Sequence, residues 1–233
     1  MRVPGPDASP RLLCVPGVGL DDRAWRPTLD ALRARGSLAP AVVALLPGYG
    51  RRPTDRDDLR PSALGALLAE RWLAEVSAPI MVVGHSASCQ IVAHATALLP
   101  DKVSSVVLVG PTTDPRAAGW SRIAERWLRT ALWERPGQVP LLVRTYSRTG
   151  LLWILRAMDA ARREDTRASL RDVGCPVVVA RGRHDRICPQ DWAAELVAEA
   201  PPGSTTVTLD RGAHMVPLTH GAELAAVLSA VVV

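Results

Sequence analysis

Short apolar runs alternate with longer segments of helical periodicity along most of the chain. The apolar runs span residues 11–15, 41–46, 79–84, 103–110, 176–182 and 205–209, bounded by Pro or Gly. Helical segments follow them at residues 22–35, 61–75, 87–99, 190–200 and from 221 onward. Continuously apolar runs are typical of strands that are buried on both faces. The pattern therefore predicts a doubly wound, mostly parallel α/β sheet with helices on both sides.

The alternation stops between residues 111 and 173, where helical periodicity dominates and no strand-like run occurs. We predict an α/β core from residues 1–110 and 174–233 and a helical insertion at 111–173, called the cap below. Two interpretations of the Trp residues in the cap stay open, because their rings either pack it onto the core or line an apolar substrate pocket. These residues, four of the chain's seven Trp, are Trp120, Trp127, Trp133 and Trp153.

Composition excludes several classes of protein. With 48% apolar and 22% charged residues, the chain is neither disordered, nor collagen-like, nor a coiled coil. The formal charge of +5 raises the question of nucleic-acid binding. However, the basic residues, all Arg except Lys102, are spread along the chain with no basic run and no zinc-finger spacing. We therefore expect no nucleic-acid partner.

Cysteine usage and hydropathy predict a cytoplasmic protein. The four Cys residues are widely separated and form no C-x-x-C pair, which favours free thiols in a reducing compartment. The first residues contain only a short apolar run at 12–15, so we expect no signal peptide. No apolar stretch approaches the ~20 residues of a membrane span. No motif indicates a metal or a cofactor, and the sequence leaves a homodimer open.

The strongest chemical signal is the sequence Gly84-His85-Ser86-Ala87-Ser88, between an apolar run and a helical segment. This is the pattern of a nucleophile elbow, a tight strand-to-helix turn that holds its serine in a strained conformation. Such a turn tolerates only small neighbours; Gly84 meets this requirement and Ser88 nearly does. It also places the hydroxyl at a helix N-terminus, where developing negative charge is favoured. We therefore predict that Ser86 is a nucleophile.

A serine nucleophile needs a base and an orienting acid. His214 follows the last predicted strand in a Gly-containing loop, where α/β sheets build their sites, and is the predicted base. Asp185 follows the strand at 176–182 and is the predicted acid, with Asp114 as the alternative. The resulting order Ser, Asp, His is the one found with nucleophile elbows. The other histidines are His85, His94, His184 and His220, and for His214 the alternative is an ordinary surface-loop residue.

Two backbone N–H groups are candidates for an oxyanion hole. One belongs to Ala87, directly after the nucleophile, and the other to Val18 in the turn Pro16-Gly17-Val18-Gly19 after the first strand. A dinucleotide-binding turn is the rival interpretation of this glycine pair. It is disfavoured because Asp22 stands where the third glycine of G-x-G-x-x-G would be.

With these motifs, the chain resembles the small, helically capped members of the α/β-hydrolase superfamily from residue 11 onward. The resemblance rests on five motifs: the P-G-x-G turn, with Pro16 where many members have His; the segment 46–51; G-H-S-x-S; G-x-x-D-x-x-x-P at 182–189; and G-x-H at 212–214. About ten residues precede the first strand, so we expect the family's initial hairpin to be trimmed and about six strands to remain.

The resemblance and the motifs imply a serine hydrolase. We expect it to cleave a carboxylic ester, lactone or thioester of an apolar small molecule through an acyl-enzyme on Ser86. Alternatives are a C–C bond hydrolase or a cofactor-free, non-hydrolytic enzyme using the same triad, and a non-catalytic small-molecule binding protein. Arg181, Arg183 and Arg186 flank Asp185 and are expected to be solvated charges, with attraction of an anionic substrate as the alternative. The predicted pocket walls are Val18, Tyr49, Trp120, Trp127, Trp133, Trp153 and Met158.

Overall fold

A computed structural model of the chain describes residues 11–36 and 40–231. Its centre is a six-stranded sheet in the order β2-β1-β5-β6-β7-β8, in which every pairing is parallel. The predicted mostly parallel sheet of about six strands is thus confirmed. Its strands are β1 (Leu12–Val15), β2 (Ala41–Val43), β5 (Ile80–His85), β6 (Val103–Val109), β7 (Val177–Gly182) and β8 (Thr205–Leu209).

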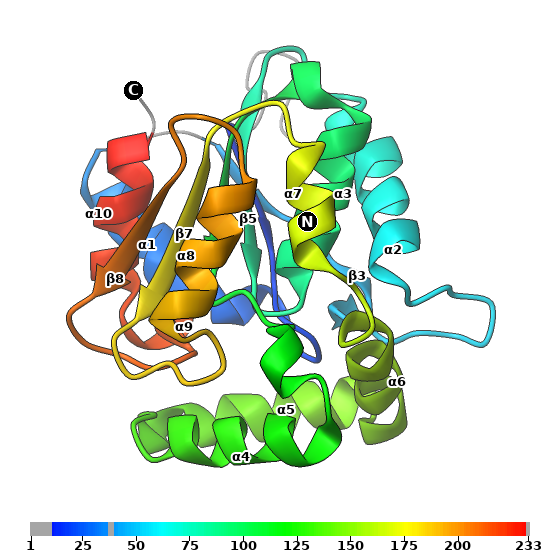
Figure 1. Cartoon of the computed structure of the whole chain (residues 1–233), viewed down its shortest axis with the longest axis vertical. Helices are drawn as coiled ribbons and strands as arrows, with labels where there is room; N and C mark the ends of the chain where they lie inside the picture. Colours follow the sequence, from blue (N-terminus) through cyan, green and yellow to red (C-terminus); the bar gives the residue numbers. More distant parts are fainter. Residues whose placement is uncertain (1–10, 37–39, 232–233) are drawn as a thin grey trace.

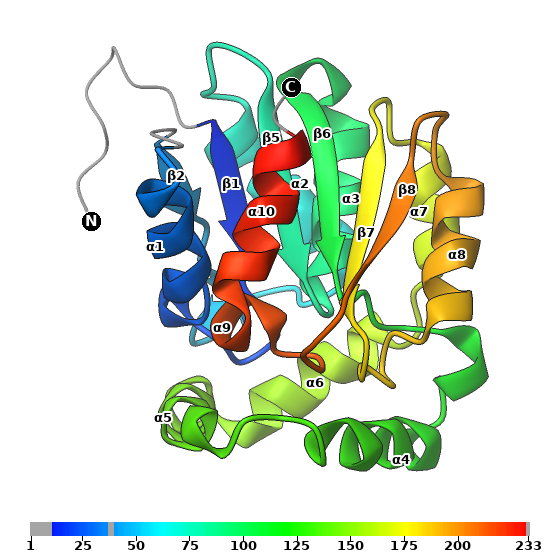
Figure 2. The same ribbon diagram turned by 90° about the vertical axis from the view of Figure 1, so that its left-hand side faces the viewer.

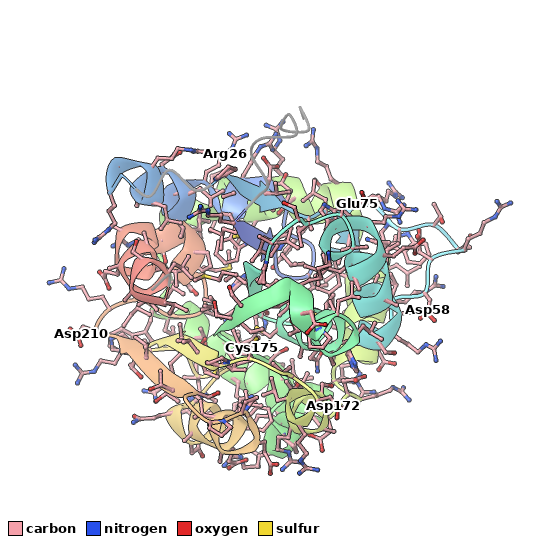
Figure 3. The ribbon with its side chains drawn as sticks, turned by 90° about the horizontal axis from the view of Figure 1, so that it is seen from above. Arg26, Asp58, Glu75, Asp172, Cys175 and Asp210 are labelled. Carbon is pink, nitrogen blue, oxygen red and sulfur yellow. The ribbon has the colours of Figure 1, made fainter. Side chains whose placement is uncertain are left out.

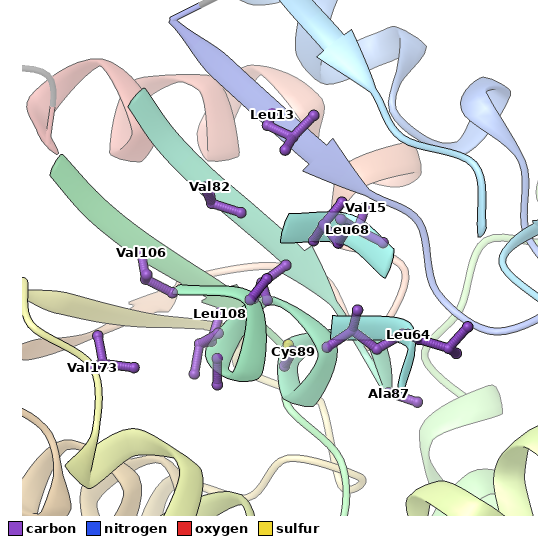
Figure 4. Close-up of a cluster of buried hydrophobic side chains, with 14 of the residues drawn as sticks. Leu13, Val15, Leu64, Leu68, Val82, Ala87, Cys89, Val106, Leu108 and Val173 are labelled. Atoms are coloured by element: carbon purple, nitrogen blue, oxygen red, sulfur yellow. The ribbon is translucent and has the colours of Figure 1, made fainter. Parts of the chain in front are cut away.

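Helices cover both faces of this sheet (Figure 1). On each central strand, successive side chains point to opposite faces of the sheet, because strand residues alternate between faces. They therefore belong to two separate hydrophobic cores, one on each face. Leu13 and Val82 belong to one buried cluster with residues of α2, α3 and α8, and Figure 4 shows part of this cluster, whereas Leu12 and Met81 belong to a second cluster with residues of α1 and α10. The covering helices are α1 (Arg26–Ala34), α2 (Pro61–Leu68), α3 (Ser88–Leu98), α7 (Thr166–Arg171), α8 (Gln190–Glu199), α9 (Val216–Thr219) and α10 (Gly221–Val231).

Three predicted elements are divided in the structure. The helix expected at 22–35 is a 3₁₀ turn, Asp22–Ala24, followed by α1, which begins where Pro27 fits the first turn. The helix expected at 61–75 is α2 and then a π-helical turn, Ala69–Leu73. The strand expected at 41–46 ends early at Val43, and the chain then forms a small separate pair, β3 (Leu46–Pro47) with β4 (Gly50–Arg51).

The segment 111–173 contains no strand. Its last helix, α7, packs beside α3 and α8, whereas the rest of the segment lies at the end of the sheet to which the strand arrowheads point (Figure 2). Its main helices are α4 (Trp120–Ala131), α5 (Val139–Thr149) and α6 (Leu151–Ala161). The carboxyl ends of parallel strands are where α/β folds bind ligands, so the cap faces the expected site. Seen from above, the labelled charged residues Arg26, Asp58 and Asp210 lie at the rim of the molecule (Figure 3).

Two further expectations can be compared with the structure. All four cysteines are buried and free, as predicted from their spacing. Within residues 11–36 and 40–231, no helix combines the length and the hydropathy that crossing a bilayer requires.

Candidate active site

Ser86 lies in the tight turn between β5 and α3. Its φ of +60° is in the left-handed region, which non-glycine residues adopt only when their surroundings impose it. The Ser86 N–H donates to the carbonyl of Val109 at 2.9 Å, which ties the turn to the neighbouring strand. At Gly84 a Cβ atom would lie 2.9 Å from both the Cα of Cys89 and the carbonyl oxygen of Ser88. Glycine is therefore required two positions before Ser86, as the sequence predicts.

Ser88, where the elbow pattern has glycine, is held by hydrogen bonds within the turn. Its Oγ accepts from the His85 N–H at 2.8 Å and lies 2.9 and 3.0 Å from the carbonyl oxygens of His85 and Val15, to which it can donate. The side chain is completely buried. The hydroxyl thus connects the turn to β1, which explains how the pattern tolerates a residue larger than glycine.

The structure brings Ser86, His214 and Asp185 into one chain of hydrogen bonds. His214 Nε2 lies 2.8 Å from Ser86 Oγ, and His214 Nδ1 lies 2.9 Å from Asp185 Oδ2. All three side chains are buried. Since an ionised carboxylate only accepts, Nδ1 carries the proton and the neutral ring presents the Nε2 lone pair to the Ser86 hydroxyl. This is the arrangement in which an imidazole can remove the proton of a serine.

Gly110 makes room for this chain of hydrogen bonds. It follows β6 with a φ of +57°, and a Cβ there would lie 2.9 Å from Asp185 Oδ2 and 3.0 Å from His214 Nδ1. Gly110 was not among the predicted site residues. Its position directly after a buried strand could have indicated a glycine that is required beside the site.

Asp185 is held in its ionised form. Its Oδ1 accepts from the N–H groups of Ile187 and Cys188, at 2.9 and 3.0 Å. Burial favours the neutral acid, but His214 and the backbone donors outweigh it, and the pKa of Asp185 lies below its usual value. Asp114, the alternative acid, is instead paired with Arg116 at 2.8 Å and Arg126 at 2.6 Å.

One of the three arginines near Asp185 is not solvated as the sequence predicted. Arg183 and Arg186 are exposed, but Arg181 is buried and is not a solvated charge. Its Nε donates to the carbonyl of Cys188 at 2.7 Å, and its terminal nitrogen donates to the carbonyl of Asp185 at 2.9 Å. Arg181 therefore fixes the shape of the loop that carries Asp185.

His214 and His85 have opposite electrostatic environments. Burial lowers the pKa of His214, but the charge and hydrogen bond of Asp185 and the charge of Glu134 outweigh it, so this pKa lies above the usual value. For His85, burial and the nearby His214 lower the pKa to about 3. His85 is thus neutral, and its Nε2–H donates to the carbonyl of His214 at 3.0 Å. Of these two residues, His214 is therefore the one that can act as a base.

The two predicted oxyanion-hole residues, Val18 and Ala87, both line the cavity that contains Ser86. Their N–H groups donate to no acceptor in the described part of the chain, so both are free to bind a ligand. The loop that contains Val18 is held in place by a hydrogen bond, in which the N–H of Gly19 donates to the carbonyl of Gly48 at 2.7 Å.

A cavity of about 240 Å³ lies between the cap and Ser86, and its walls are largely apolar. Of the predicted pocket residues, Val18, Trp127 and Met158 line it. Of the α6 wall only Met158 was predicted, although Leu151, Ile154, Leu155 and Met158 have the spacing of one helical face. The remaining walls include Leu20, Thr112, Thr113, Arg126, Tyr146, Arg162, Ile187 and Met215.

Four predicted pocket residues lie elsewhere. Tyr49 is fully buried in the core, and Trp153 packs against the same core with Arg156 over its ring at 4.8 Å. Trp120 lies at the surface under Arg162, at 5.2 Å. Trp133 stacks on His184, with 3.8 Å between the ring centroids. Trp153 and Trp133 support the packing interpretation, Trp127 supports the pocket interpretation, and Trp120 supports neither.

Comparisons with known proteins agree on the family. The profile of the alpha/beta hydrolase family matches residues 12–227. A pimeloyl-[acyl-carrier protein] methyl ester esterase of Neisseria meningitidis is 25% identical, over 95% of this chain and 92% of that protein. Lipase LipV of Mycobacterium tuberculosis is 32% identical, over 52% of this chain and 43% of its own length. A hydrolase structure from Oleispira antarctica superimposes with a TM-score of 0.78 at 16% identity, covering 96% of this chain and 90% of that one.

Proposed function

The chain belongs to the α/β-hydrolase family, and we propose that it cleaves a carboxylic ester, lactone or thioester of an apolar small molecule through an acyl-enzyme on Ser86. The family relationship and the esterase and lipase relatives support an enzyme of the carboxylic-ester hydrolase type. The proposal of an acyl-enzyme is supported above all by the position of the Ser86 hydroxyl. It is hydrogen-bonded to His214 and lies at the wall of an apolar cavity.

The proposed reaction begins when His214 Nε2 takes the proton of Ser86 as Oγ attacks the acyl carbon. The N–H groups of Val18 and Ala87 donate to the resulting oxyanion; each such donor is worth ~10²–10³ in rate. His214 then gives the proton to the leaving alcohol, thiol or lactone oxygen, and the acyl group stays on Ser86. In the second half, His214 activates a water that releases the acid and restores the hydroxyl.

The cavity walls support an apolar substrate. Ile154, Leu155 and Met158 of α6 and Trp127 of α4 surround the space above Ser86, and apolar side chains bind hydrocarbon by removing it from water. In this proposal the cap, residues 111–173, selects the acyl group. A location in the cytoplasm also stays a prediction; the four free, buried thiols support it. The homodimer option is left open.

Pre-steady-state kinetics with chromogenic acyl esters test the proposal. An acyl-enzyme that forms faster than it hydrolyses releases a burst of chromophore equal to the concentration of Ser86, and Ser86→Ala abolishes the burst. The same experiment tests the alternative of a binding protein with a hydrolase fold. Binding of these esters without release, across all chain lengths, would favour that alternative and contradict the proposal.

A further inference from the structure

One short segment at the end of α4 contacts both loops that carry the predicted acid and base. Glu134 lies just after α4, and its Oε1 accepts hydrogen bonds from the N–H groups of His214 and Met215, both at 2.8 Å. Its second carboxylate oxygen accepts from Gln138 Nε2 at 3.1 Å, which fixes the orientation of the carboxylate. A single side chain of the cap thus binds the backbone of the His214 residue itself.

The same segment also holds the loop of Asp185. The buried hydroxyl of Thr130 accepts from the N–H of Arg186 at 3.0 Å and donates to the carbonyl of Arg126 at 2.8 Å. Trp133 stacks on His184 with the two rings nearly parallel, at an interplanar angle of 4°. The residues on each side of Asp185 are therefore bound by the cap, as are His214 and the residue that follows it.

We propose that Glu134 is a positioning residue for His214, and that residues 130–134 form a clamp through which the cap sets the geometry of the acid and base loops. This inference rests on the proposed function, because it assigns to Glu134 an effect on the reaction at Ser86. Hydrogen bonds to a charged acceptor are shorter and stronger than neutral ones, so the carboxylate is well suited to fix two N–H groups of a loop. Movement of the cap away from the core would release both loops together.

The charge of Glu134 has a separate, measurable effect. Glu134 is among the groups that raise the pKa of His214, after Asp185. His214 is active as a base only when neutral, so hydrolysis is lost as the pH falls through this raised pKa. Removing the charge lowers the pKa, and the acid limb of the pH profile then moves to lower pH.

Two substitutions of Glu134 distinguish its effect on the position of His214 from the effect of its charge on the pKa of His214. Glu134→Gln keeps an oxygen that accepts from the two N–H groups but removes the charge, so it retains most of the kcat that Glu134→Ala loses, while the acid limb shifts to lower pH. Glu134→Ala removes both, and kcat falls about 10- to 100-fold with little change in KM, because a base displaced by about 1 Å loses that much. The matched control is Glu125→Gln on the exposed face of α4, where Glu125 pairs with Arg122 and Arg129.

The loop of Asp185 offers an independent variant. Thr130→Val removes the acceptor for the Arg186 N–H at nearly constant volume and lowers kcat, whereas Thr130→Ser restores the hydroxyl and the activity. Rescue by serine separates the loss of the hydrogen bond from a general effect of substitution in the cap. If valine and serine behave alike, the clamp does not act through Thr130 and that half of the proposal is wrong.

A titration distinguishes failure of this inference from failure of the proposed function. The Cε1–H signals of the five histidines, followed by NMR against pH, report the pKa of His214 whether or not the protein hydrolyses anything. We expect a lower His214 pKa in Glu134→Gln and no change in Glu125→Gln. Equal pKa values and equal kcat in the Glu134 variants and the control would overturn the inference. Absence of an acyl-enzyme in the wild type, with the pKa shift present, would instead overturn the proposed function.

Discussion

Single residues account for the shape of the turn that carries Ser86. Gly84 was predictable because the constraint is local: its Cβ would collide with atoms four and five residues away. The role of Ser88 was not, since its hydroxyl reaches Val15 on β1, a segment that only the folded chain brings near. The burial of Arg181 was not predictable either, because its bonds to the carbonyls of residues 185 and 188 depend on the folded shape of that loop. Sequence patterns report steric limits along the chain better than hydrogen bonds made across it.

Ser88→Ala should therefore destabilise the fold. It leaves the buried N–H of His85 without its acceptor and the carbonyl of Val15 without its donor, at a cost of about 1–3 kcal/mol in the free energy of unfolding. Urea denaturation measures this difference. The control is Ser62→Ala at an exposed position of α2, expected to change stability by less than about 0.5 kcal/mol. Equal stability of the two variants would mean that the turn does not depend on the hydroxyl.

At the level of elements, the apolar runs predicted the sheet well, whereas the inner face of the cap was beyond the sequence. Strands buried on both faces have a distinctive pattern, and the four inner strands β1, β5, β6 and β7 have it, whereas the edge strand β8 is mostly exposed. A cap helix carries apolar residues on more than one side, and tertiary packing decides which side faces inward. Trp120 and Trp127 are both 41% exposed, yet only Trp127 lines the cavity.

Helix α6 allows the two roles of cap residues to be separated. Met158→Ala enlarges the cavity, so the preferred acyl chain should lengthen while stability changes little. Trp153→Ala should do the reverse: although the sequence favoured a substrate contact, Trp153 packs on the core, so we expect a loss of about 2 kcal/mol of stability with an unchanged chain-length preference. Rates for a series of p-nitrophenyl esters, with thermal denaturation in parallel, measure both effects. A changed preference in Trp153→Ala alone would contradict this assignment.

In the molecule as a whole, the sheet and the cap have different structural roles. The sheet fixes Ser86 in a strained turn and brings Asp185 and His214 to the ends of neighbouring strands, which the order of motifs predicts. The cap closes an apolar cavity over Ser86 and binds the two loops through residues 130–134. These contacts join residues 50 or more positions apart, so no local pattern could reveal them.

The central claim is that Ser86 is a nucleophile activated by His214. Its most direct test is covalent labelling with a fluorophosphonate, followed by intact mass and by peptide mapping of the modified residue. We predict one adduct per chain, located on Ser86 and absent in Ser86→Ala and His214→Ala. Labelling that persists in Ser86→Ala, or a wild-type chain that is not labelled at all, would contradict the account.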